Sequence, residues 1–109
     1  MHVQPAILPL LDADGFLADW STWNEEVAAI LAAAAGLELD SCRLEVVLVL
    51  RDYFRKHGHS PAMRAMVSLV RRELGTGKGR SVYLLRLFPE SPARVAARIA
   101  GLPRPEHCL

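Results

Sequence analysis

The sequence predicts a mainly α-helical protein: a small orthogonal bundle of about five helices with an N-terminal β-hairpin and a flexible C-terminal arm. Its 109 residues suffice for one modest hydrophobic core. Apolar residues recur at helical spacing through most of the chain, and capping residues or prolines precede these stretches while glycine or proline ends them. We expect one domain over residues 1–109, with a hairpin region (1–20), a helical body (21–100) and a mobile arm (101–109).

The N-terminal hairpin is predicted from residues 6–18, AILPLLDADGFLA, in which two short apolar runs flank Asp12-Ala-Asp-Gly15. Asp and Gly at these positions are typical of a tight turn between two strands. Pro9 would confine its strand to the edge of a sheet.

The first helix is predicted over residues 23–35. Thr22 and Glu25 have the spacing of a capping box, in which each side chain bonds the other residue's amide. Gly36 ends the apolar pattern.

The second helix is predicted over residues 41–57, with Asp40 or Ser41 as its cap. The run EVVLVL within it would also suit a buried strand. The pattern continues through Phe54 and ends at His57-Gly58, which favours a helix.

Three shorter helices follow. One begins at Ser60-Pro61 and ends at Leu74, one covers residues 81–88, and one runs from Ser91-Pro92 to Ala100. Gly101 is the expected left-handed residue after the last helix.

The net charge of +1 conceals two halves of opposite sign. Residues 1–50 hold one basic residue and eight acids, whereas residues 51–109 hold twelve basic residues and four acids. Part of this charge is expected to pair within the fold. The rest would give the C-terminal half a basic surface that attracts an acidic protein, a nucleic acid or an anionic cofactor.

The C-terminal segment carries the clearest functional signal. Cys108 is the penultimate residue, and Gly101, Pro103 and Pro105 precede it in a segment that cannot continue the helix. An extended path would place the thiol about 20 Å beyond the helix end. A thiol on such an arm suits a carrier that is activated within a partner's active site.

The charges around Cys108 are mixed. His107 and Arg104 would favour its thiolate, while Glu106 and the terminal carboxylate oppose it. Cys42, near the start of the second helix, is expected to be an ordinary half-buried side chain.

Two other motifs do not predict a metal or phosphate site. His57 and His59 could bind zinc together with Cys108 or His107, but no zinc-binding motif supports this. The GTGKG loop lacks the spacing of a phosphate-binding loop. We therefore expect no metal and no cofactor.

The chain resembles the DsrC/TusE family of sulfur-relay proteins over essentially its whole length. The resemblance lies in DADGFL, WNEE, LEVVLVLRDYF, HSPAMR, YLLRLFP and the terminal ARIAGLPRP followed by the penultimate cysteine. It implies a cytoplasmic carrier that accepts sulfane sulfur on Cys108 as a persulfide. In the TusE branch, an upstream sulfurtransferase complex of the TusBCD kind loads the carrier. The sulfur then passes to the tRNA thiouridylase that forms 2-thiouridine at the wobble position, so that tRNA is an indirect partner.

The DsrC branch, which docks into dissimilatory sulfite reductase, uses a second cysteine ten residues before the penultimate one. Here Ala97 and Arg98 occupy that region, which favours the TusE branch. The family often has K-G-P where this chain has Glu90-Ser91-Pro92, a departure that removes a positive charge near the arm.

Within this interpretation Gly101, Pro103, Arg104 and Pro105 direct the arm. A docking surface is predicted from four basic residues: Lys78, Arg80, Arg94 and Arg98. Catalysis would belong to the partners rather than to this chain.

Three alternatives stay open: a partner of a sulfite reductase or sulfur-oxidation system, a helical regulator that uses Cys108 as a redox sensor, and a plain interaction module. A membrane helix and a signal peptide are not expected, because no run of eighteen apolar residues and no basic leader is present.

Overall fold

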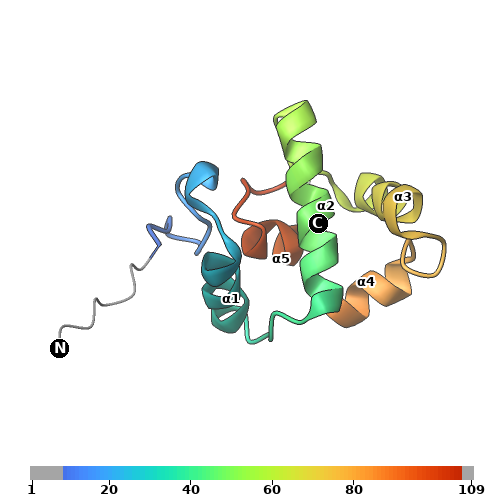
Figure 1. Cartoon of the computed structure of the whole chain (residues 1–109), viewed down its shortest axis with the longest axis horizontal. Helices are drawn as coiled ribbons and strands as arrows, with labels where there is room; N and C mark the ends of the chain where they lie inside the picture. The colour runs from blue at the N-terminus through green and yellow to red at the C-terminus, as the bar shows by residue number, and fades with distance from the viewer. Residues whose placement is uncertain (1–8, 107–109) are drawn as a thin grey trace.

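The structure is a computed structural model and describes residues 9–106. This range holds a short 3-10 helix and five α-helices (Figure 1). They are η1 (Trp20–Thr22), α1 (Glu25–Ala34), α2 (Ser41–His57), α3 (Met63–Leu74), α4 (Ser81–Leu87) and α5 (Pro92–Ile99). The predicted mainly helical fold with five helices is confirmed.

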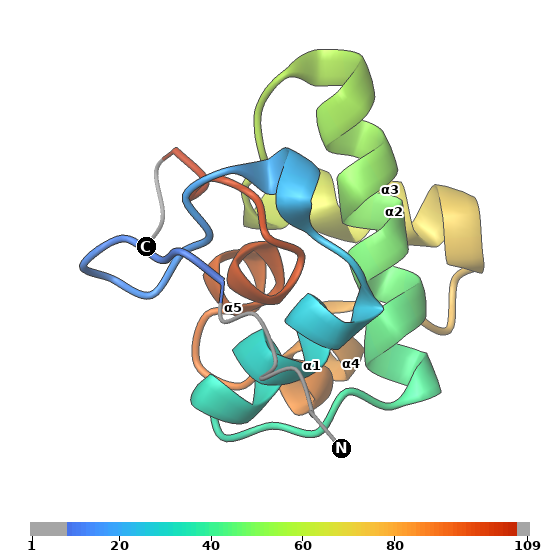
Figure 2. The same ribbon diagram turned by 60° about the vertical axis from the view of Figure 1, so that its left-hand side comes forward.

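Helix α5 is the centre of the bundle and packs against each of the other four α-helices (Figures 1 and 2). Its buried face consists largely of alanines at helical spacing, Ala93, Ala96 and Ala97, together with Ile99. Small side chains let neighbouring helices approach closely, and the larger core residues of α2, α3 and α4 fill the space around them.

Helix α2 confirms the predicted boundaries. Asp40 Oδ1 accepts a hydrogen bond from the Arg43 amide at 2.8 Å, and Gly58 ends the helix with φ +75°. The run EVVLVL, which could have been a strand, is helical. Its residues Val46, Val47 and Leu50 form one buried face of the helix, and Phe54 extends this face.

Helix α1 begins two residues later than predicted. Its cap is Asn24, whose Oδ1 accepts from the Val27 amide at 2.8 Å, so the predicted capping box of Thr22 with Glu25 is wrong. Thr22 belongs to η1 instead, and its hydroxyl donates to the Asp19 carbonyl at 2.7 Å.

Helix α3 also begins later than predicted, at Met63, and it has no side-chain cap. Ser60 was expected to cap this helix. Its hydroxyl instead donates to the carbonyl of Pro103 at 2.5 Å, across 43 residues. Ser60 therefore makes a hydrogen bond to a residue far away in the sequence and does not cap the helix.

The predicted N-terminal β-hairpin is wrong. Within residues 9–106 the segment contains one antiparallel bridge, Leu11 to Leu17, and no strand. The predicted turn does form, because Asp12 Oδ1 accepts from the amides of Asp14 and Phe16, each at 2.9 Å. Residues 6–8 of the predicted hairpin lie outside the described range.

The hairpin does not form because the segment has too few buried apolar side chains. Leu10 is 80% exposed, so the segment offers no apolar face on which a two-stranded sheet could rest, and an isolated hairpin is marginal in water. Only Phe16 and Leu17 enter the core.

In the part of the chain that the structure describes, no helix is both long and apolar enough to span a lipid bilayer.

Candidate functional site

The predicted sulfur-bearing residue, Cys108, and its neighbour His107 lie outside the described residues. The structure does describe the six residues that lead to them, Gly101–Glu106, which we call the tail root. The candidate site is therefore the tail root and the body residues that hold it.

Gly101 turns the chain out of α5. It has φ +69°, and its amide donates to the carbonyl of Arg98 at 3.1 Å. A Cβ at this position would lie 2.5 Å from Trp23 Cδ1 and 2.8 Å from Leu17 Cδ2. Only glycine satisfies both the left-handed backbone and this close packing, as the sequence predicts.

Arg51 binds the C-terminal end of α5. Its Nη1 donates to the Ala100 carbonyl at 2.9 Å and its Nη2 to the Trp20 carbonyl at 3.2 Å, although the residue is only 5% exposed. The guanidinium also lies 4.3 Å from the ring centroid of Trp23. Trp23 Nε1 in turn donates to the Ile99 carbonyl at 2.9 Å. Two side chains thus bind the last carbonyls of α5.

No carboxylate bonds to Arg51 among the described residues, and its Nε has no hydrogen-bond partner there. Burial lowers the pKa of the guanidinium, and the nearby charge of Arg55 adds to this effect. The negative end of the α5 dipole and the tryptophan ring compensate the buried charge. Sequence reasoning missed Arg51. The available signal was an arginine within the apolar run of residues 44–54.

The tail root continues along the body. Leu102 is fully buried and its amide donates to the Ala97 carbonyl at 3.0 Å. The Pro103 carbonyl accepts from Ser60, and Pro105 is buried. Two buried apolar residues, Leu102 and Pro105, thus enclose the polar anchors of the tail root.

Arg104 joins the tail root to the N-terminal turn. It forms an ion pair with Asp14, and its guanidinium lies 5.3 Å from the ring centroid of Phe16. Figure 2 shows the tail root beside the segment of residues 9–19. The Phe16 amide is the main cause of the lowered pKa of Asp12, to which the Asp14 amide and the charge of Arg104 contribute.

Residues 101–106 of the predicted arm lie along the body. Leu102 and Pro105 bury apolar surface on the body, and Ser60 and Asp14 bind the polar groups between them. The two prolines keep the chain from continuing the helix, but their path follows the body instead of leaving it.

The four basic residues predicted as a docking surface do not gather in one place. Arg98 Nε donates to the Gly15 carbonyl at 3.3 Å, at the N-terminal turn. Lys78 forms an ion pair with Glu45, and this hydrogen bond raises the pKa of Lys78. The α3–α4 loop that carries Lys78 lies far from the N-terminal turn in both Figure 1 and Figure 2. Arg80 and Arg94 are exposed.

Between residues 9 and 106, no three His, Cys, Asp or Glu side chains lie close enough to hold a metal ion. His57 packs against Tyr53 with ring centroids 4.3 Å apart and the rings tilted by 39°, and the ring centroid of His59 lies 5.5 Å from that of Tyr53. Cys42 is exposed rather than half-buried.

Comparison with known proteins identifies the family of this chain. The family model described as DsrC like protein matches residues 8–109. The chain is 42% identical to a Haemophilus influenzae protein named Sulfurtransferase TusE homolog and 41% identical to Sulfurtransferase TusE of Escherichia coli. In each case the match covers 98 residues, 90% of both chains.

Two solved structures share the fold. The first, the NMR structure of Allochromatium vinosum DsrC, has a TM-score of 0.82 and 37% identity over 91% of this chain and 88% of that one. The second is the oxidised γ-subunit of the dissimilatory sulfite reductase, DsrC, from Archaeoglobus fulgidus. It has a TM-score of 0.78 and 40% identity over 93% and 92% of the two chains. Sequence and fold thus agree over nearly the whole chain, and this protein belongs to the DsrC/TusE family.

Proposed function

We propose that this protein is a sulfur carrier of the TusE type, which accepts sulfane sulfur on Cys108 as a persulfide and passes it to an acceptor enzyme. The relatives named sulfurtransferases, similar over 90% of the chain, support this proposal. The family model matches residues 8–109, which include the helical body and the C-terminal segment.

The transfer itself is an exchange between two sulfur atoms. The Cys108 thiolate attacks the outer sulfur of a persulfide on the donor protein, and a new S–S bond forms at Cys108. The bond between the donor's two sulfurs breaks, and the donor leaves as a thiolate. The oxidation level is unchanged overall, so no reductant is needed at this step. A later attack by the acceptor removes the outer sulfur.

The observation that carries the proposal is the anchored tail root. Ser60 fixes the Pro103 carbonyl and Asp14 binds Arg104, only a few residues before the cysteine in sequence. Two residues of chain span at most about 7 Å, which is the reach left beyond Glu106 while the tail root stays bound. The anchored tail root gives the segment that follows it a defined starting point on the body.

The cellular role follows from the TusE-type relatives. We propose that a sulfurtransferase complex loads Cys108 in the cytoplasm and that a tRNA thiouridylase takes the sulfur for 2-thiouridine at the wobble position. The tRNA would then contact the acceptor rather than this chain. The reaction centres would lie in the partners, with this chain supplying the transferred sulfur.

The solved DsrC structures support a second candidate, a partner of a sulfite reductase. That role in the family depends on a second cysteine ten residues before the penultimate one. Ala97 is fully buried in α5 and Arg98 binds the Gly15 carbonyl, so neither position supplies a thiol. The carrier role with one cysteine is therefore the better interpretation.

Mass spectrometry of the intact protein tests the proposal. Wild type and Cys108→Ser would be incubated with a cysteine desulfurase, cysteine and the upstream relay proteins under non-reducing conditions. We expect one added sulfur atom on the C-terminal peptide of the wild type, which dithiothreitol removes and the variant lacks. Sulfur distributed equally between Cys42 and Cys108, or no added sulfur, would contradict the proposal.

A further inference from the structure

The outer surface of α4 is apolar. Leu84 and Leu87 are buried on the inner side of the helix, as expected. On the outer side Val82 is 67% exposed and Leu85 is 43% exposed, one helical turn apart. A surface helix normally has polar residues on its outer side. Val82 and Leu85 instead form an exposed apolar patch, whose burial against a partner would be favourable.

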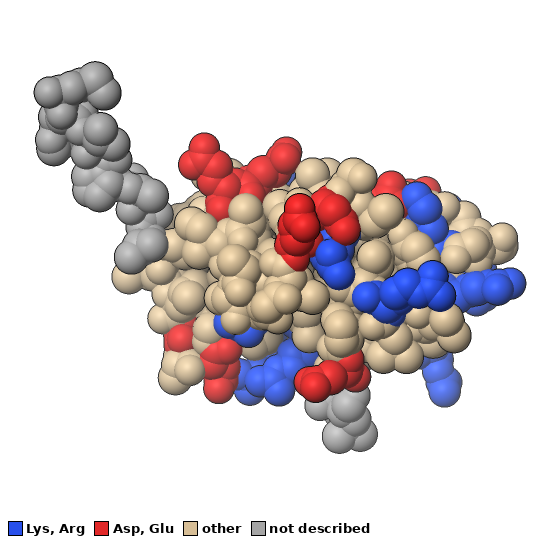
Figure 3. Space-filling model, turned by 90° about the horizontal axis from the view of Figure 1, so that it is seen from below, with Lys and Arg blue, Asp and Glu red and all other residues tan. Residues whose placement is uncertain are grey.

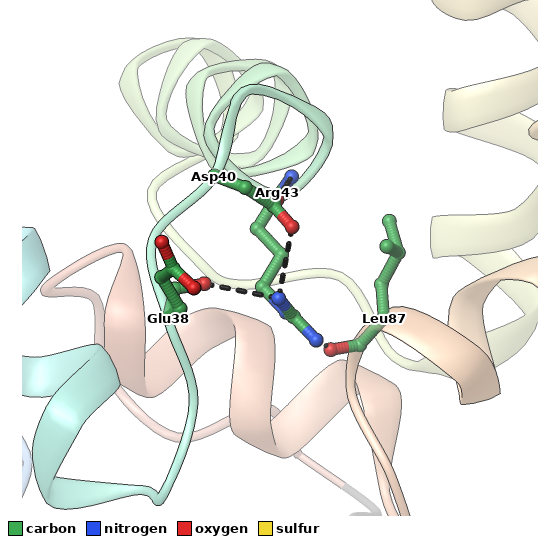
Figure 4. Close-up of polar contacts among 4 residues, drawn as sticks. All are labelled: Glu38, Asp40, Arg43 and Leu87. Atoms are coloured by element: carbon green, nitrogen blue, oxygen red, sulfur yellow. Dashed lines mark hydrogen bonds and ion pairs between the residues drawn. The ribbon is translucent and has the colours of Figure 1, made fainter.

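This helix is held firmly at both ends. Arg43 Nε donates to the Leu87 carbonyl at 2.7 Å, while Nη1 of the same side chain donates to the Glu38 carbonyl at 3.0 Å (Figure 4). Before the helix, Arg71 Nη2 donates to the Gly79 carbonyl at 3.0 Å. A rigid helix loses little entropy when a partner binds it, which favours a docking role.

The surroundings of the patch are basic. Residues 63–98 contain eight basic residues and two acids. Figure 3 shows Lys and Arg side chains at the end of the molecule at which Figure 1 places α3 and α4, and a second group at the lower left of the view. Arg80 and Arg86 flank the patch, are exposed, and have no carboxylate partner within residues 9–106.

We propose that Arg80, Val82, Leu85 and Arg86, the α4 surface, form the docking site for the protein that loads Cys108. The matching surface on that donor has an apolar centre bordered by carboxylates. This inference rests on the proposed function, and it adds a binding site on the helical body to the reactive thiol at the C-terminus. The arginines would steer the acidic donor, and Val82 and Leu85 would supply the buried contact.

Other occupants fit less well. A second copy would bring basic α4 surfaces together, and like charges repel. Residues 1–8 contain no carboxylate that could pair with the arginines. An RNA would pair with the arginines but would gain little from Val82 and Leu85, because bases stack on aromatic side chains.

The donor also fits better than the acceptor. An enzyme that modifies tRNA presents a basic surface to its substrate, since phosphate contacts dominate RNA affinity. Such a surface would repel Arg80 and Arg86. The donor binds no RNA in this scheme, so its docking surface can be acidic.

The test compares two ways of loading the same full-length protein. The first sulfur source is the donor protein complex with cysteine desulfurase and cysteine, and the second is glutathione persulfide, which needs no docking. The variant is Val82→Gln/Leu85→Gln, because glutamine removes the apolar contact and retains helix propensity. The control is Leu48→Gln, an exposed leucine (46%) on α2 beside α3.

We expect the second-order rate constant for loading by the donor to fall at least about tenfold in the double variant and to stay unchanged in the control. Glutathione persulfide should load all three proteins equally. Equal loading of wild type and double variant by the donor would overturn the docking site while leaving the carrier function intact. Failure of both sulfur sources to load wild type would overturn the carrier function and the docking site together.

Cys42 offers an independent readout. Tyr83 on α4 is near this exposed thiol: burial, and then a hydrogen bond with Cys42, raise the pKa of Tyr83. In Cys108→Ser protein, where Cys42 is the only thiol, the donor should slow alkylation of Cys42 by iodoacetamide. Protection by tRNA but not by the donor would overturn the proposal in favour of an RNA site.

Discussion

The hydroxyl of Ser60 donates a hydrogen bond of 2.5 Å to the carbonyl of Pro103, and so joins the α2–α3 connection to the tail root. Ser60 is only 4% exposed. The contact fixes the chain five residues before Cys108 in sequence. The position of Pro103 therefore depends on the helical body.

Replacing Ser60 with alanine should loosen the tail root. The substitution removes a part-buried hydrogen bond to the carbonyl of the exposed residue Pro103, which costs about 0.5–1.5 kcal/mol in unfolding free energy. Urea unfolding measures this loss, and hydrogen exchange of the Leu102 amide, bonded to the Ala97 carbonyl, should accelerate. Thr76→Ala, in the exposed α3–α4 loop, serves as the control and should change neither quantity. An unchanged exchange rate in Ser60→Ala would show that Leu102 alone holds the tail root.

Gly101→Ala should be strongly destabilising. The left-handed backbone costs about 1–2 kcal/mol for a residue with a Cβ, and the contacts with Trp23 and Leu17 add about 1–3 kcal/mol. Thermal unfolding should therefore show a melting temperature lower by about 10 °C or more. Gly77→Ala is the matched control, because a Cβ there meets no atom within 4 Å and Gly77 lacks a positive φ. Equal melting temperatures of the two variants would contradict the packing described for Gly101.

Asp12 should make stability depend on pH. Its pKa lies below the usual value of 3.8, mainly because its carboxylate accepts from the Phe16 amide. The folded state thus binds its proton less readily than the unfolded state. The stabilisation is fully present above pH 3.8 and is lost as pH falls through the lowered pKa of the folded state.

Comparison of wild type with Asp12→Asn isolates this effect. Wild type should be the more stable protein at pH 7, and the difference should shrink as the pH falls below about 4. Urea unfolding at several pH values measures this difference in unfolding free energy, and the surface variant Asp52→Asn serves as control. A difference that stays constant from pH 7 to pH 2 would mean that the charge of Asp12 contributes nothing.

Glu90→Gly should stabilise the protein. Glu90 has φ +73° and is the one residue other than glycine with positive φ in the described range. Glycine relieves a cost of about 1–2 kcal/mol but adds disorder to the unfolded chain, for a net gain of about 0.5–1 kcal/mol. Glu90→Ala removes the same charge and keeps the Cβ, so it should not share the gain. Thermal unfolding of both variants decides whether backbone strain or charge matters at this position.

Several features were predictable from sequence because their causes are local. The boundaries of α2 follow from Asp40 as cap, Gly58 as end and the apolar spacing between them. Gly101 was identified as the residue after the last helix because few other residues adopt a positive φ. The family resemblance, carried by short motifs along the chain, is confirmed by the match over residues 8–109.

Other predictions failed because groups with the right local chemistry found other partners, or because an apolar segment found no core to enter. Ser60 and Thr22 have the chemistry of helix caps, but one bonds to Pro103 and the other lies in η1. The apolar segment around Asp12 has the spacing of a hairpin, but only Phe16 and Leu17 find a core to enter. Local pattern alone does not reveal these competing partners.

The sequence by itself determined the helical class, the helix order and the family, because each depends on neighbouring residues or on short motifs. Only the tertiary structure decided that the tail root lies on the body and that Arg51 binds the end of α5. It also decided that the predicted basic residues divide between two ends of the molecule. These features depend on contacts between residues that are 31 to 90 positions apart in the chain, and such contacts form only when the helices pack around α5.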